Sequence, residues 1–222
     1  MTRTRTYGDA CGISRALDRI GERWALMIVR ELLLGPKRFT DLRTGLPPAS
    51  PNVLSQRLRE LEQAGVVRRR TLAPPAGSRV YELTEWGLEL EPVITALGRW
   101  GARAPLSPPE IGMSLDAHVL SLKTLFDPGL AEGFAATLEL RLGEQRFRAD
   151  VAGGELEVVR GEASTPDAVV TTDPGTLLAL AHRRRGFPDA LAAGEIAIEG
   201  DGRAVERFLG LFTLPPPAAS AA

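Results

Sequence analysis

The stretch SPNVLSQRLRELEQAGVVRRR, residues 50–70, predicts a capped helix that runs into a short strand. Ser50 is a favoured N-cap residue, and Pro51 suits the first helical position, where no N–H is required. Gly65 suits the position just past a helix end. The residues that share one stripe at about 100° per residue are Leu54, Leu58 and Leu61. This pattern indicates a helix with one buried face.

The opposite face of this helix carries hydrogen-bond donors and acceptors but little net charge. In the major groove of DNA, Asn and Gln side chains pair with adenine edges and Arg pairs with guanine. A merely solvated face is the alternative interpretation of this helix by itself. The residues that we expect to contact bases are Asn52, Val53, Gln56, Arg59 and Gln63.

The flanking segments favour the DNA-binding interpretation. RFTDLRTGLPPAS, residues 38–50, predicts a short helix and then a proline-rich turn, which gives the order helix, turn, helix. Residues 66–72 and 78–84 predict two strands joined by APPAG, a turn signal, and such a hairpin forms a wing. Basic side chains on both flanks are placed to meet phosphates. The predicted phosphate contacts are Arg38, Arg43, Ser50, Arg68, Arg69, Arg70 and Arg79.

The charge of the chain divides along its length. Residues 1–105 hold 17 Lys and Arg against 11 Asp and Glu, a net charge of +6, whereas residues 106–222 hold 10 against 17, a net charge of −7. This asymmetry indicates two domains with different partners, of which the first approaches nucleic acid. We expect a DNA-binding and dimerisation domain at 9–103, a proline-rich linker at 104–112, a second domain at 113–214 and a disordered tail at 215–222.

Several classes of protein are disfavoured by composition. No apolar run reaches the ~18 residues of a membrane span. The first residues include two arginines but no apolar core of a signal peptide. A single cysteine excludes an internal disulfide framework. We therefore expect a cytoplasmic protein without a membrane partner.

The N-terminal half resembles a known family. Its motifs are W-x-L-x-I-x-R-E-L at 24–32, R-F-x-D-L at 38–42 and L-S-x-R-L-R-E-L-E-x-x-G-V-V at 54–67. Together they resemble the HxlR family of bacterial winged helix-turn-helix transcription regulators over about residues 9–103. The resemblance implies a homodimer joined through the first and last helices of this domain. It also implies two recognition helices in successive major grooves of an inverted repeat in double-stranded DNA.

Two features of this half bear on the dimer and on sensing. Trp86 and Trp100 lie in segments with an apolar excess, which favours a dimer interface. Cys11 matches a position where many HxlR relatives carry a cysteine, and some of them use it to sense oxidants or electrophiles. A thiol just before a helix start is favoured as thiolate by the helix dipole. The alternative role of Cys11 is that of a small buried apolar residue.

The C-terminal half alternates apolar and polar residues, as in a sheet with one buried face. Helices are predicted at 114–126, 174–184 and 203–212, and hairpin turns at Gly143-Glu144 and Gly153-Gly154. The whole chain is therefore expected to be α+β, a winged helix-turn-helix domain followed by a domain of helices over an antiparallel sheet.

This half lacks the patterns of a catalytic or metal site. His118 and His182 are the only histidines and fall on separate helices. No Ser or Cys has a base in a nucleophile motif. We expect no catalytic activity, no metal and no cofactor.

A second resemblance concerns a ligand cavity. D-A-x-V-x-T at 167–172 and G-E-I-x-I-x-G-D at 194–201 make residues 115–214 similar to a sterol-carrier-protein (SCP-2-like) domain. That resemblance implies an apolar cavity between sheet and helices, although ordinary core packing is the alternative for each residue. The candidate lining residues are Phe126, Phe134, Leu178, Phe187, Phe208 and Phe212.

These observations predict a dimeric transcription regulator, more specifically a repressor, whose operator affinity changes when a hydrophobic small molecule binds the second domain. One alternative is a redox regulator switched through Cys11. Another is a lipid or polyketide carrier whose helix-turn-helix is a scaffold, although the basic charge of the first half argues against it.

Overall fold

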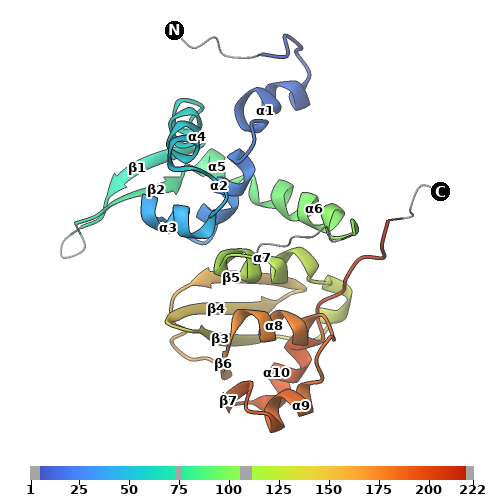
Figure 1. Cartoon of the computed structure of the whole chain (residues 1–222). Helices are drawn as coiled ribbons and strands as arrows, with labels where there is room; N and C mark the ends of the chain where they lie inside the picture. Colours follow the sequence, from blue (N-terminus) through green and yellow to red (C-terminus); the bar gives the residue numbers. More distant parts are fainter. Residues whose placement is uncertain (1–5, 74–76, 106–111, 219–222) are drawn as a thin grey trace. The chain divides into compact units, whose positions relative to one another are not determined.

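The computed structural model describes residues 6–73, 77–105 and 112–218, and the chain divides into two compact units, residues 1–94 and 95–222 (Figure 1). We call them the N-terminal unit and the C-terminal unit. Their boundary lies within helix α6, and the predicted linker 104–112 lies largely outside the described residues. No helix among the described residues is long and apolar enough to cross a membrane.

The N-terminal unit is a winged helix-turn-helix, as predicted. Its elements are α1 (Gly12–Ile20), α2 (Ala25–Leu32), α3 (Phe39–Gly45), α4 (Pro51–Gln63), β1 (Val67–Thr71), β2 (Arg79–Leu83), α5 (Glu85–Leu88) and the first turn of α6 (Glu91–Gly101). The stripe of Leu54, Leu58 and Leu61 is completely buried against α2 and α3 residues such as Ile28 and Leu42. The core therefore fixes which face of α4 is turned outward.

The wing is a two-stranded antiparallel sheet. Val67 pairs with Leu83 at its base, and Thr71 pairs with Arg79 at the far end of the two strands. Residues 74–76 of the predicted turn lie outside the described residues. A second attachment joins this sheet to the helices, because the backbone groups of Lys37 and Tyr81 exchange hydrogen bonds of 2.9 and 2.8 Å.

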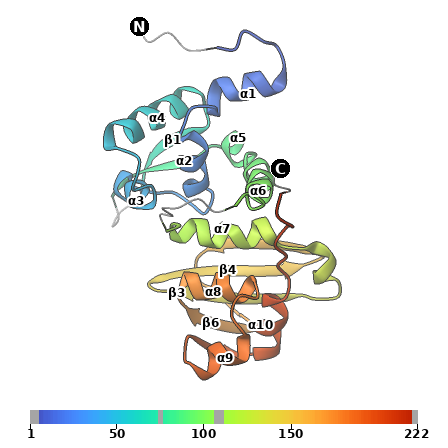
Figure 2. The ribbon, with the colours of Figure 1, turned by 45° about the vertical axis from the view of Figure 1, so that its right-hand side comes forward.

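The C-terminal unit places helices over one face of a five-stranded sheet with strand order β5-β4-β3-β6-β7 (Figure 2). Its strands are β3 (Ala136–Leu142), β4 (Gln145–Ala152), β5 (Glu155–Arg160), β6 (Ala168–Thr172) and β7 (Ile196–Gly200). Its helices are α7 (Leu115–Leu125), the 3-10 turn η1 (Pro128–Ala131), α8 (Pro174–Ala181), α9 (Phe187–Ala192) and α10 (Gly202–Leu209). Alternate residues such as Leu138, Leu140 and Phe147 are buried beneath the helices.

The sheet differs from the expectation in one respect, because it is mixed and not antiparallel throughout. β3 and β6 run parallel, with Leu140 opposite Val170. After β5, at one edge, the chain crosses over and enters β6 on the other side of β3. Alternation of side chains specifies the buried face of a strand but not its direction, so this crossover could not be read from the pattern.

The predicted disordered tail also requires a correction at its beginning. The Arg103 side chain donates through Nε to the Pro216 carbonyl oxygen at 3.1 Å, and the Ala218 N–H donates to the Arg103 carbonyl at 2.9 Å. Arg103 thus supplies one donor and one acceptor to the tail, whose prolines have carbonyl oxygens but no N–H. Residues 219–222 lie outside the described residues.

Candidate nucleic-acid interface

The recognition helix α4 begins and ends as its sequence dictates. The Ser50 hydroxyl accepts a hydrogen bond from the Val53 N–H at 3.3 Å, and Pro51 occupies the first helical turn. Gly65 has a φ of +76°, a conformation in which other residues are strained. This turn leads directly into β1 and so fixes the wing next to the helix.

The outward face of α4 is polar, and its side chains make few hydrogen bonds within the chain. Its exposed residues are Asn52, Gln56, Arg59 and Gln63, while Val53 is half-buried at the edge. The Gln56 amide donates to Glu60 at 3.0 Å. Within the described part of the chain, Arg59 has no hydrogen bond or ion pair. A face of this kind can offer its donors and acceptors to base edges.

The neighbouring Arg57 has a different role from Arg59. Its side chain is only 12% exposed, bonds to Glu60 and lies 3.6 Å from the Glu22 carboxylate, which precedes α2. Arg57 therefore joins α4 to the α1–α2 connection. The apolar periodicity of α4 places Arg57 beside the buried stripe, and this is the signal that separates it from Arg59.

The three arginines of β1 are exposed but paired with carboxylates. Glu82 accepts from Arg68 at 2.7 Å and from Arg70 at 2.8 Å, and Glu62 accepts from Arg69 at 2.8 Å. These pairs hold the basic side chains along the wing. Phosphate contacts would have to replace or share these partners.

The remaining predicted phosphate contacts lie on α3, at the start of α4 and on β2. Arg38 and Arg43 of the α3 region and Ser50 are exposed, and so is Arg79 of β2. The Arg38 backbone N–H donates to the Asp41 carboxylate at 2.9 Å, which caps α3. The arrangement brings the predicted base contacts onto one helix and the predicted phosphate contacts onto its flanks.

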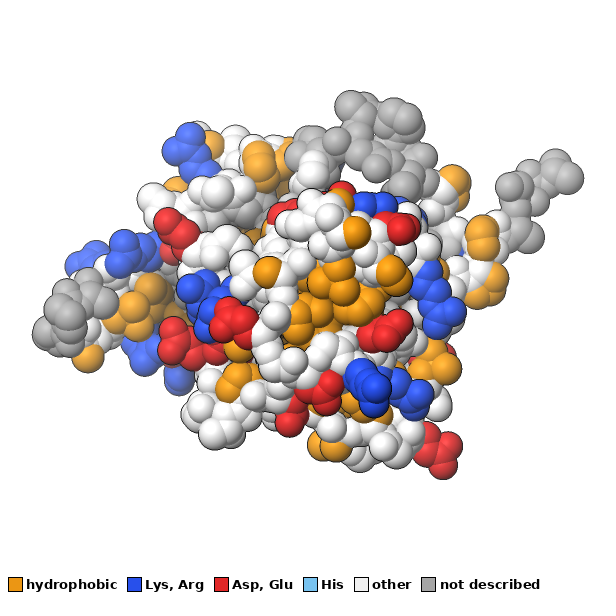
Figure 3. All heavy atoms as spheres, turned by 90° about the horizontal axis from the view of Figure 1, so that it is seen from below, with side chains coloured by type: hydrophobic (Ala, Val, Ile, Leu, Met, Phe, Trp, Pro, Cys, Tyr) orange, Lys and Arg blue, Asp and Glu red, His pale blue; other side chains and the backbone are white. Residues whose placement is uncertain are grey.

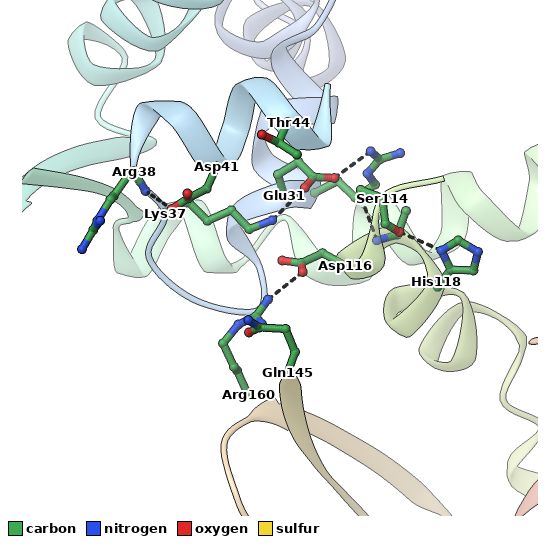
Figure 4. Close-up of polar contacts among 12 residues, drawn as sticks. Glu31, Lys37, Arg38, Asp41, Thr44, Ser114, Asp116, His118, Gln145 and Arg160 are labelled. Atoms are coloured by element: carbon green, nitrogen blue, oxygen red, sulfur yellow. Dashed lines mark hydrogen bonds and ion pairs between the residues drawn. The ribbon is translucent and has the colours of Figure 1, made fainter. Parts of the chain in front are cut away.

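A buried carboxylate that the sequence reasoning missed supports this frame. Glu31 is completely buried in α2, and it accepts from Arg30 at 2.7 Å and from Lys37 at 2.8 Å (Figure 4). A Cβ atom added to Gly45 at the end of α3 would lie 2.3 Å from Glu31 Oε2. Glu31 thus occupies space that glycine leaves open. The available signal was an R-E pair inside an otherwise apolar helix.

Large apolar side chains are exposed on α1 and α5. Ile13 of α1 is 71% exposed and Trp86 of α5 is 49% exposed, and Leu17 and Leu88 are also exposed. Arg19 of α1 lies over the Trp86 ring at 5.9 Å. We call Ile13, Leu17, Trp86 and Leu88 the apolar face of the N-terminal unit. Trp100, in the part of α6 that belongs to the C-terminal unit, is 71% exposed.

Cys11 precedes α1 and is exposed, so it is not a buried apolar residue. Its backbone N–H donates to the Asp9 carboxylate at 2.9 Å, and the Ser14 hydroxyl donates to the same group at 3.0 Å. These two hydrogen bonds hold the pKa of Asp9 below its usual value. The negative charge at the N-terminus of α1 is therefore the carboxylate of Asp9.

The predicted ligand residues of the C-terminal unit occupy two kinds of environment. Phe126, Phe208 and Phe212 are buried, with the Phe208 and Phe212 rings 5.1 Å apart edge to face. The half-buried residues are Phe134, Leu178 and Phe187. The unit also contains an open cavity of about 600 Å³, lined by Leu130, Leu211 and several charged residues of α10 and the α8 end. None of the six predicted residues lines that cavity.

Polar contacts elsewhere in the C-terminal unit are structural. Asp116 of α7 accepts from Arg160 of β5 at 2.6 Å, and the His118 ring contacts the Ser114 carbonyl at 2.9 Å (Figure 4). Among the described residues, no group of three or more His, Cys, Asp or Glu could hold a metal ion.

Comparison with known proteins separates the same two halves. Residues 19–106 match the HxlR-like helix-turn-helix family, and residues 112–218 match the alkyl sulfatase C-terminal family. Over 86 residues the chain is 38% identical to the uncharacterized HTH-type transcriptional regulator YvaP of Bacillus subtilis. This match covers 39% of this chain and 80% of that protein.

Two solved structures are also similar to parts of the chain. The redox regulator HypR in its oxidized form is 34% identical, with a TM-score of 0.38, and the match covers 41% of this chain and 94% of that one. A double mutant of the sec-alkyl sulfatase PisA1 is 24% identical, with a TM-score of 0.39, and the match covers 52% of this chain and 17% of that one.

Proposed function

The chain belongs to the HxlR-like family of helix-turn-helix transcription regulators, and from this premise we propose that it is a dimeric repressor whose operator affinity depends on a hydrophobic small molecule. Two copies of α4 would enter successive major grooves of an inverted repeat, and the wings would contact the phosphates.

The observation that carries the DNA-binding part is the outward face of α4. Asn52, Gln56, Arg59 and Gln63 are exposed together, while the leucines opposite them are completely buried. A rigid helix with an exposed polar face, flanked by arginines, has the two kinds of contact that specific binding requires.

The apolar face of the N-terminal unit supports the dimer. Ile13, Leu17, Trp86 and Leu88 are all exposed, and large apolar side chains of this kind are typical of an interface between subunits. A two-fold axis beside α1 would bury this surface against its own copy. Sedimentation of the whole chain should give twice the mass of one chain.

The experiment on DNA binding compares Arg59→Ala with a control. We expect Arg59→Ala to lose about 1–3 kcal/mol on an operator selected in vitro and to relax one base position, because a bidentate contact to one base is lost. Arg69→Ala should weaken binding to all duplexes and flatten the salt dependence.

The control is Arg184→Ala, since Arg184 is exposed in the C-terminal unit. Fluorescence anisotropy with the operator and with shuffled duplexes measures both effects. If Arg59→Ala retains wild-type discrimination among operator variants, the assignment of the outward face is wrong.

The sensing part of the proposal rests on the C-terminal unit. Its covered sheet and its cavity are built from elements other than those that we propose to contact DNA. A ligand can change operator affinity only if it binds the two forms of the dimer unequally. Ligand-dependent release of the chain from operator DNA is the corresponding measurement.

A redox regulator switched through Cys11 is the second candidate, favoured by the exposure of this thiol. One thiol in each chain could form a bridge between the subunits of a dimer. Cys11→Ser should leave the response to an apolar ligand intact if the first candidate is correct. Loss of an oxidant response in this variant would favour the second. The third candidate, a lipid or polyketide carrier, does not account for the exposed polar face of α4.

A further inference from the structure

The cavity of the C-terminal unit is lined by both apolar and cationic side chains. Figure 3 shows one face of the molecule, on which hydrophobic side chains lie between acidic and basic ones. The side chains around the cavity that bear on its ligand are Leu130, Leu211, Arg183, Arg203, Arg207 and Glu206. Three guanidinium groups against one carboxylate leave an excess of positive charge.

Four arginines of the C-terminal unit are paired with carboxylates, and the three that line the cavity are not among them. Arg141, Arg148, Arg160 and Arg185 each pair with a carboxylate between 2.6 and 2.9 Å away. In contrast, Arg183 and Arg203 make no hydrogen bond or ion pair through their side chains within the described ranges. An unpaired guanidinium retains all five donors for an anion.

Arg207 is held in place without losing its charge. Its Nη2 donates to the carbonyl oxygens of Leu130 at 3.3 Å and Glu132 at 3.5 Å. These contacts are long, and neither is made with a carboxylate. Arg207 therefore joins η1 to α10 at the cavity and contributes to the positive potential there.

Arg183 occupies a backbone conformation that costs free energy. Its φ is +55°, and Trp24 is the one other non-glycine residue of the described segments with a positive φ. The next two N–H groups, of Arg184 and Arg185, both donate to the Ala179 carbonyl and close the end of α8. Glycine is the usual residue at such a position. A side chain kept there at a cost is a reason to look for a function.

The apolar residues at the cavity are Leu130 and Leu211, of which Leu211 is only 1% exposed and belongs to the core. Leu211 lies between Phe208 and Phe212 in the chain, and the rings of these two residues are in contact. Leu130 is 40% exposed and offers an aliphatic surface at the rim. An aliphatic chain on this surface would displace water and bury apolar area.

We propose that this cavity binds an amphipathic anion, with its compact oxyanion head on Arg183 and Arg203 and its aliphatic chain against Leu130. Arginine forks bind planar oxyanions through paired hydrogen bonds. The proposal rests on the proposed function, in which the C-terminal unit receives a hydrophobic ligand, and it defines the chemistry of that ligand.

The test uses the full chain and calorimetric titration with four probes of equal chain length. Decanoate and decyl sulfate, below their micellar concentrations, carry the two head groups, while 1-decanol lacks charge and decyltrimethylammonium reverses it. We expect one or both anions to bind at least about tenfold more tightly than 1-decanol, and the cation not to bind. The relative affinities of the two anions distinguish a carboxylate from a sulfate ester.

Arg183→Gly distinguishes the effect of the side chain on binding from its effect on folding. Glycine accepts the positive φ, so this variant should melt at the same temperature as the wild type or higher, yet bind decanoate about tenfold more weakly. Arg203→Gln should lose affinity to a similar extent. The matched control, Arg184→Gln, removes a neighbouring exposed arginine that does not line the cavity and should bind normally.

Failure of this inference is distinguishable from failure of the proposed function. Equal binding of 1-decanol and decanoate, or equal loss in Arg184→Gln, overturns the anion site. If decanoate binds through Arg183 but does not change the affinity for operator DNA, the anion site stands and the sensing part of the proposed function fails. If 1-decanol releases the chain from the operator and decanoate does not bind, the sensing part of the proposed function stands and the anion site fails.

Discussion

Arg57 and Arg59 are two residues apart on one helix, yet their surroundings assign them opposite roles. Arg57 is enclosed and paired with Glu60 and Glu22, whereas Arg59 is exposed and has no polar partner in the described part of the chain. Loss of Arg57 would therefore act on the stability of the N-terminal unit. Loss of Arg59 would act on its affinity for DNA, because no internal contact disappears with it.

Gly45 is the residue whose replacement most directly tests the buried carboxylate of Glu31. Gly45→Ala should destabilise the N-terminal unit by about 1–3 kcal/mol, because the new methyl group displaces Glu31 from Lys37. In a Glu31→Ala background the same change should be neutral or stabilise by up to about 1 kcal/mol, since Ala is a better helix residue than Gly. Urea unfolding of the four proteins measures this cycle.

Gly101→Ala is the matched control, because an added Cβ there meets no atom within 4 Å. Additive effects of Gly45→Ala and Glu31→Ala would show that the two residues do not share the same space.

At the scale of the elements, the wing combines basic side chains with a carboxylate that restrains them. Glu82→Gln should strengthen binding to non-specific duplex by about threefold to tenfold. In the wild type, Arg68 and Arg70 must give up their ion pairs with Glu82 before they can pair with phosphates, and in the variant this loss is absent. Anisotropy titrations at several salt concentrations measure the change, with Glu162→Gln as the control in the C-terminal unit. An unchanged affinity would mean that these arginines do not meet the phosphates.

The end of α8 makes the stability of the C-terminal unit depend on pH. Burial, with a smaller contribution from Arg184, lowers the pKa of His182 below 6.5, and its Nε2 has no partner in the described residues. Below pH 6.5 the unfolded chain therefore binds a proton that the folded chain resists, so stability falls as the pH decreases.

His182→Gln should flatten this dependence between about pH 5 and 7, and His118 is present in both proteins and cancels in the comparison. Unfolding midpoints at several pH values measure the difference. Identical pH profiles for the wild type and the variant would exclude His182 as the cause.

The elements that sequence predicts well are those whose signals are local. The Ser50 cap, the leucine stripe and Gly65 specify α4 completely, and the paired glycines at 153–154 specify a hairpin. The parallel pairing of β3 with β6 depends on where a distant segment returns, and no periodicity encodes that. α9 is too short, at six residues, to show a helical period.

The same distinction applies to the two candidate sites. The residues proposed to contact DNA could be predicted from sequence because they lie on one helix and its flanks. The cavity draws on η1, the end of α8 and α10, which are separated by up to 81 positions from Leu130 to Leu211. The run HRRRG, residues 182–186, therefore read as charge at a helix end, although one of its arginines lines the cavity and another pairs with Glu195.

At the scale of the whole molecule, the opposite charges of the two halves match a division of labour. The basic half carries the helix-turn-helix and attracts the DNA backbone, while the acidic half is repelled from it. The arginines around the cavity are an exception within the acidic half. A ligand anion there would meet local positive charge in spite of the net charge of its unit.

The extent of the C-terminal unit can be measured with fragments. The predicted domain 113–214 omits contacts that the structure places inside the unit. A Cβ atom on Gly98 would lie 3.1 Å from the Thr124 side chain, and Arg103 is hydrogen-bonded to Pro216 and Ala218. We therefore expect fragment 95–222 to melt about 5 °C or more above fragment 113–214, because each retained hydrogen bond contributes about 1 kcal/mol.

Arg103→Ala in the longer fragment should remove part of this difference, because its side chain supplies one of the two hydrogen bonds to the tail while its carbonyl supplies the other. Calorimetry of the three fragments measures their melting temperatures. We expect the highest value for 95–222, an intermediate value for its Arg103→Ala variant and the lowest for 113–214. Equal melting temperatures for 95–222 and 113–214 would place the start of the folded unit after the proline-rich stretch. The second half of α6 would then stabilise the other unit, where Ile94 packs against the helix-turn-helix core.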